Sequence, residues 1–318
     1  RLTQISSQPG ASGLPPQTFN YSYNAANQRT QDKLADGSYW VYQYDALGQV
    51  TNGVKYFYDG TLVPGQQFGY LFDDIGNRKQ TTAGGDSTGA SLRTANYTVN
   101  SLNQITARDY PGTNDVVGAA LATNSVTVNG QTAWRKGEYF WATVKSNNIA
   151  SAQWEGIKVA SGGITNTGNF YAPKTPEPFS YDADGNLTND GRWSYVWDGE
   201  NRLIQMTVNT NVGPQYQLNF AYDAKGRRIQ KVVTSNSVAI YTNKFLYDGW
   251  NLVVEVGASG TLVRSYVWGS DLSGFLQGAG GVGGLLEVSY YGAATTNCFP
   301  AFDGNGNMMA LVNAADGT

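Results

Sequence analysis

The chain contains no histidine and a single cysteine, Cys298, among its 318 residues. Without histidine there is no Ser-His-Asp triad and no zinc site with a histidine ligand. One cysteine excludes a disulfide within the chain and a cysteine cluster that would hold a metal. Any enzymatic chemistry would therefore have to use carboxylates, serine or lysine, or a metal held by oxygen ligands.

Charge and long apolar runs are also scarce. Charged residues make up only 14% of the chain and aromatic residues 13%, which is the reverse of a disordered composition. The formal net charge of -3 argues against nucleic acid, whose partners carry a basic patch. No run of about 18 apolar residues occurs, so no transmembrane helix is predicted. The opening Arg1-Leu2-Thr3 begins no signal peptide, which indicates a segment of a longer protein.

The chain has instead a repeat centred on an aromatic residue followed by aspartate. Eight of its 18 aspartates directly follow tyrosine, phenylalanine or tryptophan. These pairs are Tyr44-Asp45, Tyr58-Asp59, Phe72-Asp73, Tyr181-Asp182, Trp197-Asp198, Tyr222-Asp223, Tyr247-Asp248 and Phe302-Asp303. In the fullest copies a glycine follows three residues after the aspartate, and these glycines are Gly48, Gly76, Gly185, Gly226 and Gly306.

Each unit predicts a β-hairpin. Aspartate starts a turn by accepting a hydrogen bond from the backbone two residues on. Glycine readily adopts the left-handed backbone, and so does asparagine, which replaces it in weaker copies at Asn27, Asn103 and Asn201. The flanks alternate with a period of two, as in 193–197 and 218–222. The prediction is an all-β fold in which hairpins with type I turns and bulges build a large antiparallel sheet.

The repeat is interrupted between 110 and 178, where no aromatic-aspartate pair occurs. Strand-like runs there predict a small inserted β domain, and the proline-rich exit at 173–178 predicts an extended linker. We therefore expect repeat hairpins over 1–109, a β-sandwich-like insert over 110–178, and repeat hairpins over 179–318. The aromatic residues of the insert have two interpretations, as a surface that stacks on a ligand such as a sugar or as the insert's own core. These residues are Trp134, Tyr139, Trp141 and Trp154.

The units resemble the YD repeat of the Rhs family over roughly 19–109 and 179–318, whereas the repeat does not explain the insert. The glycine-rich stretch 266–286 and the ending from Phe302 to Thr318 are similar to the segment before the family's core region. The resemblance implies a sheet that spirals into a hollow shell around a C-terminal toxin, as in bacterial polymorphic toxins and toxin-complex C subunits. In teneurins, related repeats serve cell adhesion. The family's core region carries an aspartyl autoprotease, and this chain ends before the Asp-Pro-x-Gly motif of that region, so no cleavage residue is carried over.

Three patterns have a second interpretation. Side-chain oxygens alternate as in a calcium loop, although the same residues are those of a repeat turn. These candidates are Asp182, Asp184, Asn186 and Asp190 in one turn, and Asp303, Asn305 and Asn307 in another. The glycine run 278–283 matches a dinucleotide-binding pattern, but a strand-like segment follows it where that site needs a helix. A glycosidase needs two carboxylates across a cleft, and nothing distinguishes Asp198 and Glu200 from other turn residues.

The sequence thus predicts a non-enzymatic segment of an Rhs-type shell wall that encloses a toxin or effector, with no cofactor. The alternative is an extracellular or cell-surface fibre or adhesin in which the insert contacts carbohydrate or protein. Expected partners are the protein's own preceding and following segments, an enclosed cargo domain, and further copies joined through sheet edges. Neither nucleic acid nor a membrane span is expected. The resemblance implies a secreted or cell-surface bacterial protein.

Overall fold

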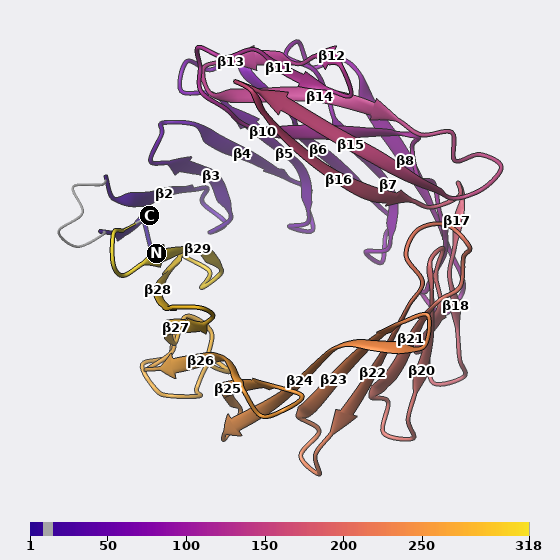
Figure 1. Ribbon diagram of the computed structural model, residues 1–318. Coiled ribbons are helices and arrows are strands. Elements are labelled where there is room, and N and C mark those ends of the chain that lie inside the picture. Colours follow the sequence, from indigo (N-terminus) through magenta and orange to yellow (C-terminus); the bar gives the residue numbers. More distant parts are fainter. Residues whose placement is uncertain (9–14, 318) are drawn as a thin grey trace. The chain divides into compact units, whose positions relative to one another are not determined.

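The computed structural model describes residues 1–8 and 15–317, and over these residues it contains strands and turns but no helix. In the described part of the chain, antiparallel sheets of ten and twelve strands carry the repeats, and two small sheets form the insert (Figure 1). The predicted all-β fold built from antiparallel hairpins is confirmed. The predicted parts 1–109 and 179–318 include residues 9–14 and Thr318, which lie outside the described residues.

The first large sheet runs from β1 to β9 in chain order and continues with β17. Its strands are β1 (Gln4–Ser7), β2 (Gln17–Tyr23), β3 (Arg29–Leu34), β4 (Tyr39–Tyr44), β5 (Val50–Tyr56), β6 (Leu62–Phe72), β7 (Arg78–Gly84), β8 (Leu92–Val99), β9 (Ile105–Arg108) and β17 (Glu177–Pro178). The pairing of β9 with β17 is antiparallel and joins Arg108 to Glu177 and Ala107 to Pro178. The chain between them, residues 109–176, is therefore an excursion from the sheet, and we call it the insert.

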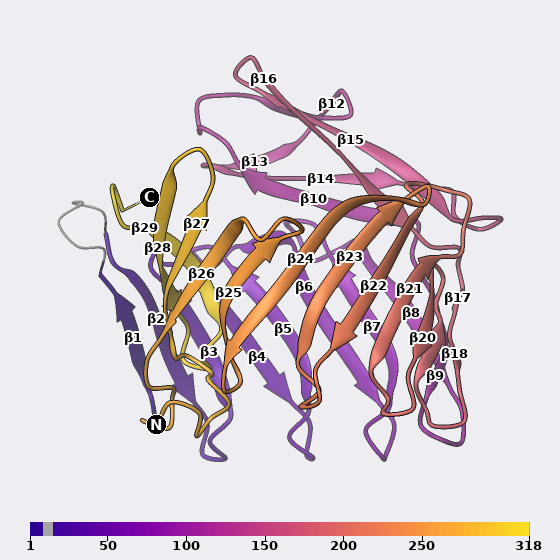
Figure 2. The ribbon, with the colours of Figure 1, turned by 60° about the horizontal axis from the view of Figure 1, so that its bottom comes forward.

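The second large sheet runs in unbroken chain order from β18 to β29. Its strands are β18 (Ser180–Tyr181), β19 (Leu187–Asn189), β20 (Trp193–Trp197), β21 (Leu203–Val208), β22 (Tyr216–Tyr222), β23 (Arg228–Ser235), β24 (Val238–Asp248), β25 (Asn251–Gly257), β26 (Leu262–Trp268), β27 (Leu285–Tyr291), β28 (Thr295–Phe302) and β29 (Met308–Asn313). Figure 2 shows β22 to β27 side by side in this order. Each strand therefore pairs with its neighbour in sequence, as expected for a meander of hairpins.

The insert is a sandwich of two small antiparallel sheets, ordered β10-β14-β13 and β12-β11-β15-β16. Its strands are β10 (Thr113–Ala119), β11 (Val126–Val128), β12 (Gln131–Thr132), β13 (Trp134–Lys136), β14 (Tyr139–Lys145), β15 (Gln153–Ser161) and β16 (Ile164–Ala172). A buried apolar cluster lies between the two sheets and is formed by Val126, Val128, Ala133, Phe140 and Val144. The insert thus has a hydrophobic core of its own.

The described chain divides into two compact units. Unit 1 comprises Arg1–Gly37, Val196–Met206 and Tyr216–Thr318, and unit 2 comprises Ser38–Tyr195 and Thr207–Gln215. Strands β4 to β9 and the insert therefore belong to the same unit. Within it, the strands of the insert lie over one face of β4 to β8 (Figure 1).

Most side chains of the repeat strands are half-buried, although single residues such as Val63, Asn243 and Val288 are fully buried. All seven residues of β22, for example, are intermediate in exposure, although they alternate between the two faces of the sheet. Fully buried side chains are a minority in the two large sheets, so contacts between neighbouring strands and hairpins contribute much of their stability.

Candidate functional site

The repeat turns share one hydrogen-bonded design, which the turn at Asp223 illustrates. The N–H of Asp223 donates to the carbonyl of Arg227 at 3.0 Å, and the N–H of Gly226 donates to the carbonyl of Asp223 at 2.9 Å. One carboxylate oxygen of Asp223 accepts the N–H groups of Lys225 and Arg227 at 2.9 and 3.0 Å. The aspartate therefore closes a five-residue turn whose fourth residue, Gly226, has a φ of 77°.

The same carboxylate geometry recurs along both large sheets. The aspartates that open such turns are Asp45, Asp73, Asp182, Asp198, Asp223 and Asp303. The aromatic residue before each one ends a strand, and these residues are Tyr44, Phe72, Tyr181, Trp197, Tyr222 and Phe302. The fourth residue of each turn has a positive φ, and these residues are Gly48, Gly76, Gly185, Asn201, Gly226 and Gly306. Two weaker copies open at Asn24 and Asn100, and their fourth residues, Asn27 and Asn103, have φ values of 67° and 62°.

The side chain of the fifth residue of the turn donates a hydrogen bond to the second carboxylate oxygen of the aspartate. The side-chain amide of Asn77 donates to Asp73 at 3.0 Å, and Nε of Arg202 donates to Asp198 at 2.8 Å. The hydrogen bond from the Asn77 side chain is the largest cause of the lowered pKa of Asp73. These contacts explain why asparagine or arginine follows the glycine position, because both side chains bring an N–H group to the carboxylate.

The aromatic residue of the repeat joins its hairpin to the preceding one. The hydroxyl of Tyr222 donates to the carbonyl of Leu203 at 2.8 Å, and that of Tyr247 donates to Arg228 at 2.9 Å. In both cases the acceptor directly follows the fifth residue of the preceding repeat turn. Tyr181 contacts Ile105 in the same way at 2.8 Å. We call this hydrogen bond the tyrosine stitch.

One tryptophan outside the aromatic-aspartate pairs, Trp268, which Gly269 follows, forms a similar bond between strands. Nε1 of Trp268 donates to the carbonyl of Leu252 at 2.7 Å. Phenylalanine has no polar tip, so Phe72 and Phe302 occupy the same position without such a donor. The stitch therefore requires an aromatic side chain with a polar tip, which agrees with the predominance of tyrosine before the aspartate.

Arginines of the turns stack on the aromatic residue of the next hairpin. The guanidinium carbon of Arg202 lies 5.4 Å from the ring centroid of Tyr222, and that of Arg227 lies 5.1 Å from that of Tyr247. The same arginine also forms an ion pair with the aspartate of its own turn, as Arg227 does with Asp223 at 2.6 Å. Each such arginine thus connects two successive hairpins.

Two of the predicted turn residues occupy different positions. Asp59 is the third residue of a turn that opens at Phe57, where Phe57 N–H donates to Thr61 at 2.8 Å. Asp248 ends β24 and pairs directly with Asn251, so the chain turns at Gly249, which has a φ of 57°. An aromatic-aspartate pair therefore does not by itself place the aspartate first in the turn.

One turn of the common design lacks the aromatic signal. Asp86 opens it, and its carboxylate accepts the N–H groups of Thr88 and Ala90 at 2.8 and 3.1 Å. Gly85 precedes the aspartate, and Gly89 is the fourth residue, with a φ of 87°. The spacing from aspartate to glycine would have identified this turn, whereas the search for an aromatic partner missed it.

The insert packs on the sheet through the strands β13 and β14. Tyr139 donates from its hydroxyl to the carbonyl of Pro64 at 2.6 Å, and its ring contacts Phe57 edge-on at 5.7 Å. The Trp134 ring lies tilted against the same Phe57 ring, with the two centroids 6.2 Å apart. Trp141 lies against Gly65, where a Cβ atom would be 2.9 Å from the indole. Burial raises the pKa of Tyr139, as expected for a side chain inside an interface.

Successive side chains of β14 point alternately to the core of the insert and to the large sheet. Phe140 and Val144 belong to the insert core, while Tyr139 and Trp141 contact the large sheet. Trp154 lies elsewhere, next to Gly213 and under Arg192, whose guanidinium carbon is 5.4 Å from the ring centroid. The structure therefore places the four predicted ligand-stacking aromatics in contacts within unit 2, and all four are half-buried.

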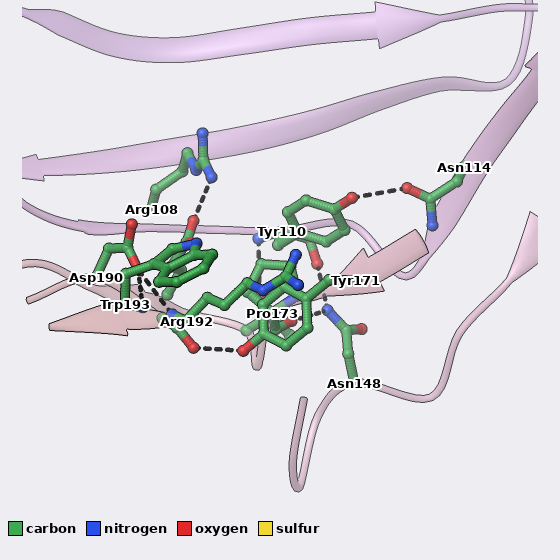
Figure 3. Close-up of polar contacts among 12 residues, drawn as sticks. Arg108, Tyr110, Asn114, Asn148, Tyr171, Pro173, Asp190, Arg192 and Trp193 are labelled. Atoms are coloured by element: carbon green, nitrogen blue, oxygen red, sulfur yellow. Dashed lines mark hydrogen bonds and ion pairs between the residues drawn. The ribbon is translucent and has the colours of Figure 1, made fainter. Parts of the chain in front are cut away.

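The two ends of the insert are tied together at its neck (Figure 3). Asn148, which is 1% exposed, donates from Nδ2 to the carbonyls of Tyr110 at 3.1 Å and Pro173 at 2.7 Å. Its own carbonyl accepts the N–H of Thr175 at 3.0 Å. Arg108 forms an ion pair with the buried Glu177, where burial outweighs the arginine and raises the pKa of the carboxyl group. The proline-rich exit is thus bonded to the sheet instead of forming a free linker.

Two of the calcium candidates, Asp182 and Asp303, use their carboxylate oxygens within the turns, whereas the side-chain oxygen of Asn305 accepts a hydrogen bond from Arg29 at 3.0 Å. The carboxylate of Asp182 accepts the N–H groups of Asp184 and Asn186 and the Asn186 amide at 2.8 to 3.0 Å. Asp303, Asn305 and Asn307 repeat this arrangement. Asp190 lies in a separate turn, where it accepts the hydroxyl of Tyr195 at 2.6 Å. In the part of the chain that the structure describes, no three acidic, histidine or cysteine side chains gather as a metal site.

Comparisons with known proteins found no matching family model and no matching curated protein. Among solved structures, the chain is similar to a chain in the crystal structure of TcdB2-TccC3-Cdc42, with 12% identity and a TM-score of 0.38. It is also similar to a chain of a Photorhabdus luminescens Tc holotoxin pore, with 12% identity and a TM-score of 0.37. Each match covers 96% of this chain and 15% of the other chain. At such TM-scores the likeness carries no weight for function.

No helix in the described residues is long and apolar enough to span a membrane.

Proposed function

We propose that this chain is a non-enzymatic wall segment of an Rhs-type, YD-repeat shell that encloses a C-terminal toxin or effector. The observation that carries the proposal is the tyrosine stitch, which bonds a hairpin to the one before it at three places, Tyr181, Tyr222 and Tyr247. A stitch of this kind connects successive hairpins without a second layer. It is therefore suited to extending a single sheet over a long repeat array.

The burial pattern supports a wall better than a globular enzyme. Most side chains of the repeat strands are half-buried, and the apolar cluster of the insert serves the insert itself. Side chains that would otherwise be weakly packed are held by the turn carboxylates, the stitches and the stacked arginines. Function in this proposal is enclosure, so no catalytic residue and no cofactor is assigned. The proposed partners are the neighbouring segments of the same protein and the enclosed cargo.

Cryo-electron microscopy of the native, full-length particle tests this proposal. We expect a closed hollow particle with density inside it that the wall does not explain. An open sheet, or a closed particle without internal density in every class, would contradict enclosure. A variant without the segment after the repeats serves as the control, because it should keep the wall and lose the internal density.

The second candidate function is a secreted or surface fibre or adhesin in which the insert contacts a carbohydrate or another protein. The rigid mounting of the insert favours it, because Asn148 and the contacts of Tyr139 fix the insert to its sheet. Mass photometry of the full-length protein separates the two candidates. Particles that grow with concentration support a fibre formed through sheet edges, whereas one fixed mass supports a closed shell.

A further inference from the structure

One long strand at the edge of the insert is open to solvent. β16 is the last strand of the sheet β12-β11-β15-β16, in which it pairs with β15. Its first six residues, 164–169, are all exposed. β13 and β14 form the layer of the insert that contacts the large sheet, whereas β15 and β16 belong to the other layer (Figure 2). The outer edge of β16 is therefore accessible to another chain.

This edge lacks the features that protect an exposed strand. Charged residues, proline and bulges keep edge strands from pairing with other chains. β16 contains neither a charged residue nor a proline, and its nine residues pair with β15 in unbroken register. The other edge strands of the insert differ, because β12 has only two residues, β13 carries Arg135 and Lys136, and β10 carries Asp115. β16 is thus the open edge of the insert.

The backbone of β16 offers hydrogen-bonding groups along this edge. Lys158 is opposite Thr167, and both its N–H and its carbonyl bond to Asn129 on the far side of β15, at 2.7 and 2.8 Å. In an antiparallel pair, two residues directly opposite each other either bond to one another or both point their backbone groups away. Thr167 therefore points its N–H and its carbonyl outward, and by alternation so do Thr165 and Asn169.

A groove of about 470 Å³ lies beside this edge, between the two sheets of the insert. Phe140 of the insert core and Val159 line it. Leu121 and Ile164 also line it, and these two side chains are 66% and 69% exposed. None of its described lining residues carries a charge. The open edge of β16 is therefore next to an uncharged and largely apolar groove.

We infer that the insert binds an extended peptide segment of another protein, which pairs with β16 as an additional strand and places alternate apolar side chains in the groove. An extended strand matches both features of the site. Its backbone groups bond to an open edge, and every second side chain points to the same face. The uncharged groove favours side chains such as valine, because a charged side chain would lose its hydration there.

A second copy of β16 matches this groove less well than an apolar strand. Ile164 and Asn166 line the groove, so Gly168 lies on the same face of the strand. A second copy that paired through β16 would bring the same three residues to the groove. An amide and a glycine would leave an apolar groove largely unfilled. The occupant that fits is therefore a segment with a different sequence.

The inference does not rest on the proposed shell, because β16 and the groove lie within unit 2. It gives the insert of the second candidate function a defined surface and a defined kind of partner. A failure of the peptide test would leave the search for a closed particle with internal density unaffected, and the reverse also holds.

Fluorescence anisotropy with the complete chain tests the inference. The probe is a fluorescein-labelled peptide as long as β16, in which threonine and valine alternate between two terminal lysines. We expect saturable binding with a Kd below about 1 mM. A peptide of the same composition with its valines adjacent should bind about tenfold more weakly, because its apolar side chains no longer share one face. Equal binding of the two peptides, or binding of neither, would overturn the inference.

N-methylation of the probe shows whether its backbone pairs with a strand. In an extended peptide the N–H groups of the valines point to one edge and those of the threonines to the other. Methylation of the edge that faces β16 should abolish binding, whereas methylation of the opposite edge should leave binding unchanged. Loss of binding in both methylated peptides, or in neither, would contradict strand addition.

Variants of the chain locate the binding site. Ile164→Lys places a charge at the groove and should weaken binding about tenfold. Ile149→Lys makes the same change at a side chain that is 71% exposed and outside the groove, so binding should stay unchanged. Equal effects of the two substitutions would refute binding at the groove. Self-association of the parent chain that Ile164→Lys abolishes would show that a second copy is the partner, against the inference.

Thr167→Pro tests the edge itself. It removes one outward N–H group and should weaken binding about fivefold, while proline at a strand edge leaves the pairing with β15 intact. Unchanged binding in a folded Thr167→Pro chain would contradict pairing with β16. If this variant fails to fold, the two lysine variants keep the test decisive, because both replace exposed side chains.

Discussion

Removal of one tyrosine hydroxyl provides a direct test of the stitch between hairpins. Tyr222→Phe keeps the ring that stacks with Arg202 and deletes only the donor to the carbonyl of Leu203, which lies 2.8 Å away. The carbonyl is half-buried, so water replaces the lost donor only in part. The variant should therefore be less stable than the parent while keeping the same fold.

We expect the free energy of unfolding to fall by about 1 kcal/mol, which is the net contribution of one neutral hydrogen bond to a half-buried acceptor. For a chain of 318 residues, this corresponds to a decrease in Tm of about 1–2 °C. Tyr247→Phe should cost the same, because Tyr247 makes the equivalent bond at 2.9 Å. The two sites lie two strands apart, roughly 9.5 Å, so the double variant should lose about 2 kcal/mol.

Differential scanning calorimetry and urea unfolding followed by circular dichroism measure these losses. Tyr58→Phe is the matched control, because the Tyr58 side chain is 74% exposed at the apex of a turn. It should change the free energy of unfolding by less than about 0.5 kcal/mol. If Tyr222→Phe and Tyr58→Phe are equally stable, the tyrosine stitch does not hold the hairpins together and the proposed wall loses its main support.

Four further predictions concern the turns and the insert. The pKa values of Asp73 and Asp182 are lowered in the folded protein, so the two carboxylates stabilise the fold above about pH 4 and lose this contribution at lower pH. The urea concentration at the midpoint of unfolding should therefore fall between about pH 4 and pH 2. Exchange of calcium for a chelator should leave the Tm unchanged within error, because turn N–H groups already occupy the Asp182 carboxylate, and a clear rise in Tm with calcium would show a site. Gly65→Ala should cost about 2 kcal/mol, since its φ is 77° and a Cβ would lie 2.9 Å from Trp141, and normal stability would refute the close approach. Asn148→Ala should cost about 3 kcal/mol and speed hydrogen exchange throughout the insert, with slow exchange contradicting its role at the neck.

Local signals in the sequence were sufficient to predict the fold class. The conformation of a hairpin turn is determined by about five consecutive residues. Aspartate, glycine and the period-two pattern of the flanking strands are therefore enough to predict a hairpin. The same signals do not specify the exact position of the aspartate within the turn. Asp59 shows this, because Phe57 opens its turn. The Asp59 carboxylate accepts the N–H of Thr61 in that turn and also pairs with Lys136 of the insert at 2.6 Å.

The contacts of the insert depend on residues that are far apart in the chain. The bond from Tyr139 to Pro64 spans 75 residues, and Asn148 bonds to Tyr110 and Pro173 without any local motif. Nothing in the sequence around Asn148 distinguishes it from an exposed asparagine.

The antiparallel pairing of β9 with β17 has a consequence for how new domains are acquired. The insert leaves the sheet and returns to it at adjacent strands, whose paired Cα atoms lie only about 5 Å apart. Any domain whose termini are that close can be grafted at this position without breaking the order of the sheet. The junction is therefore suited to the exchange of one inserted domain for another, and to carrying foreign domains in engineered chains.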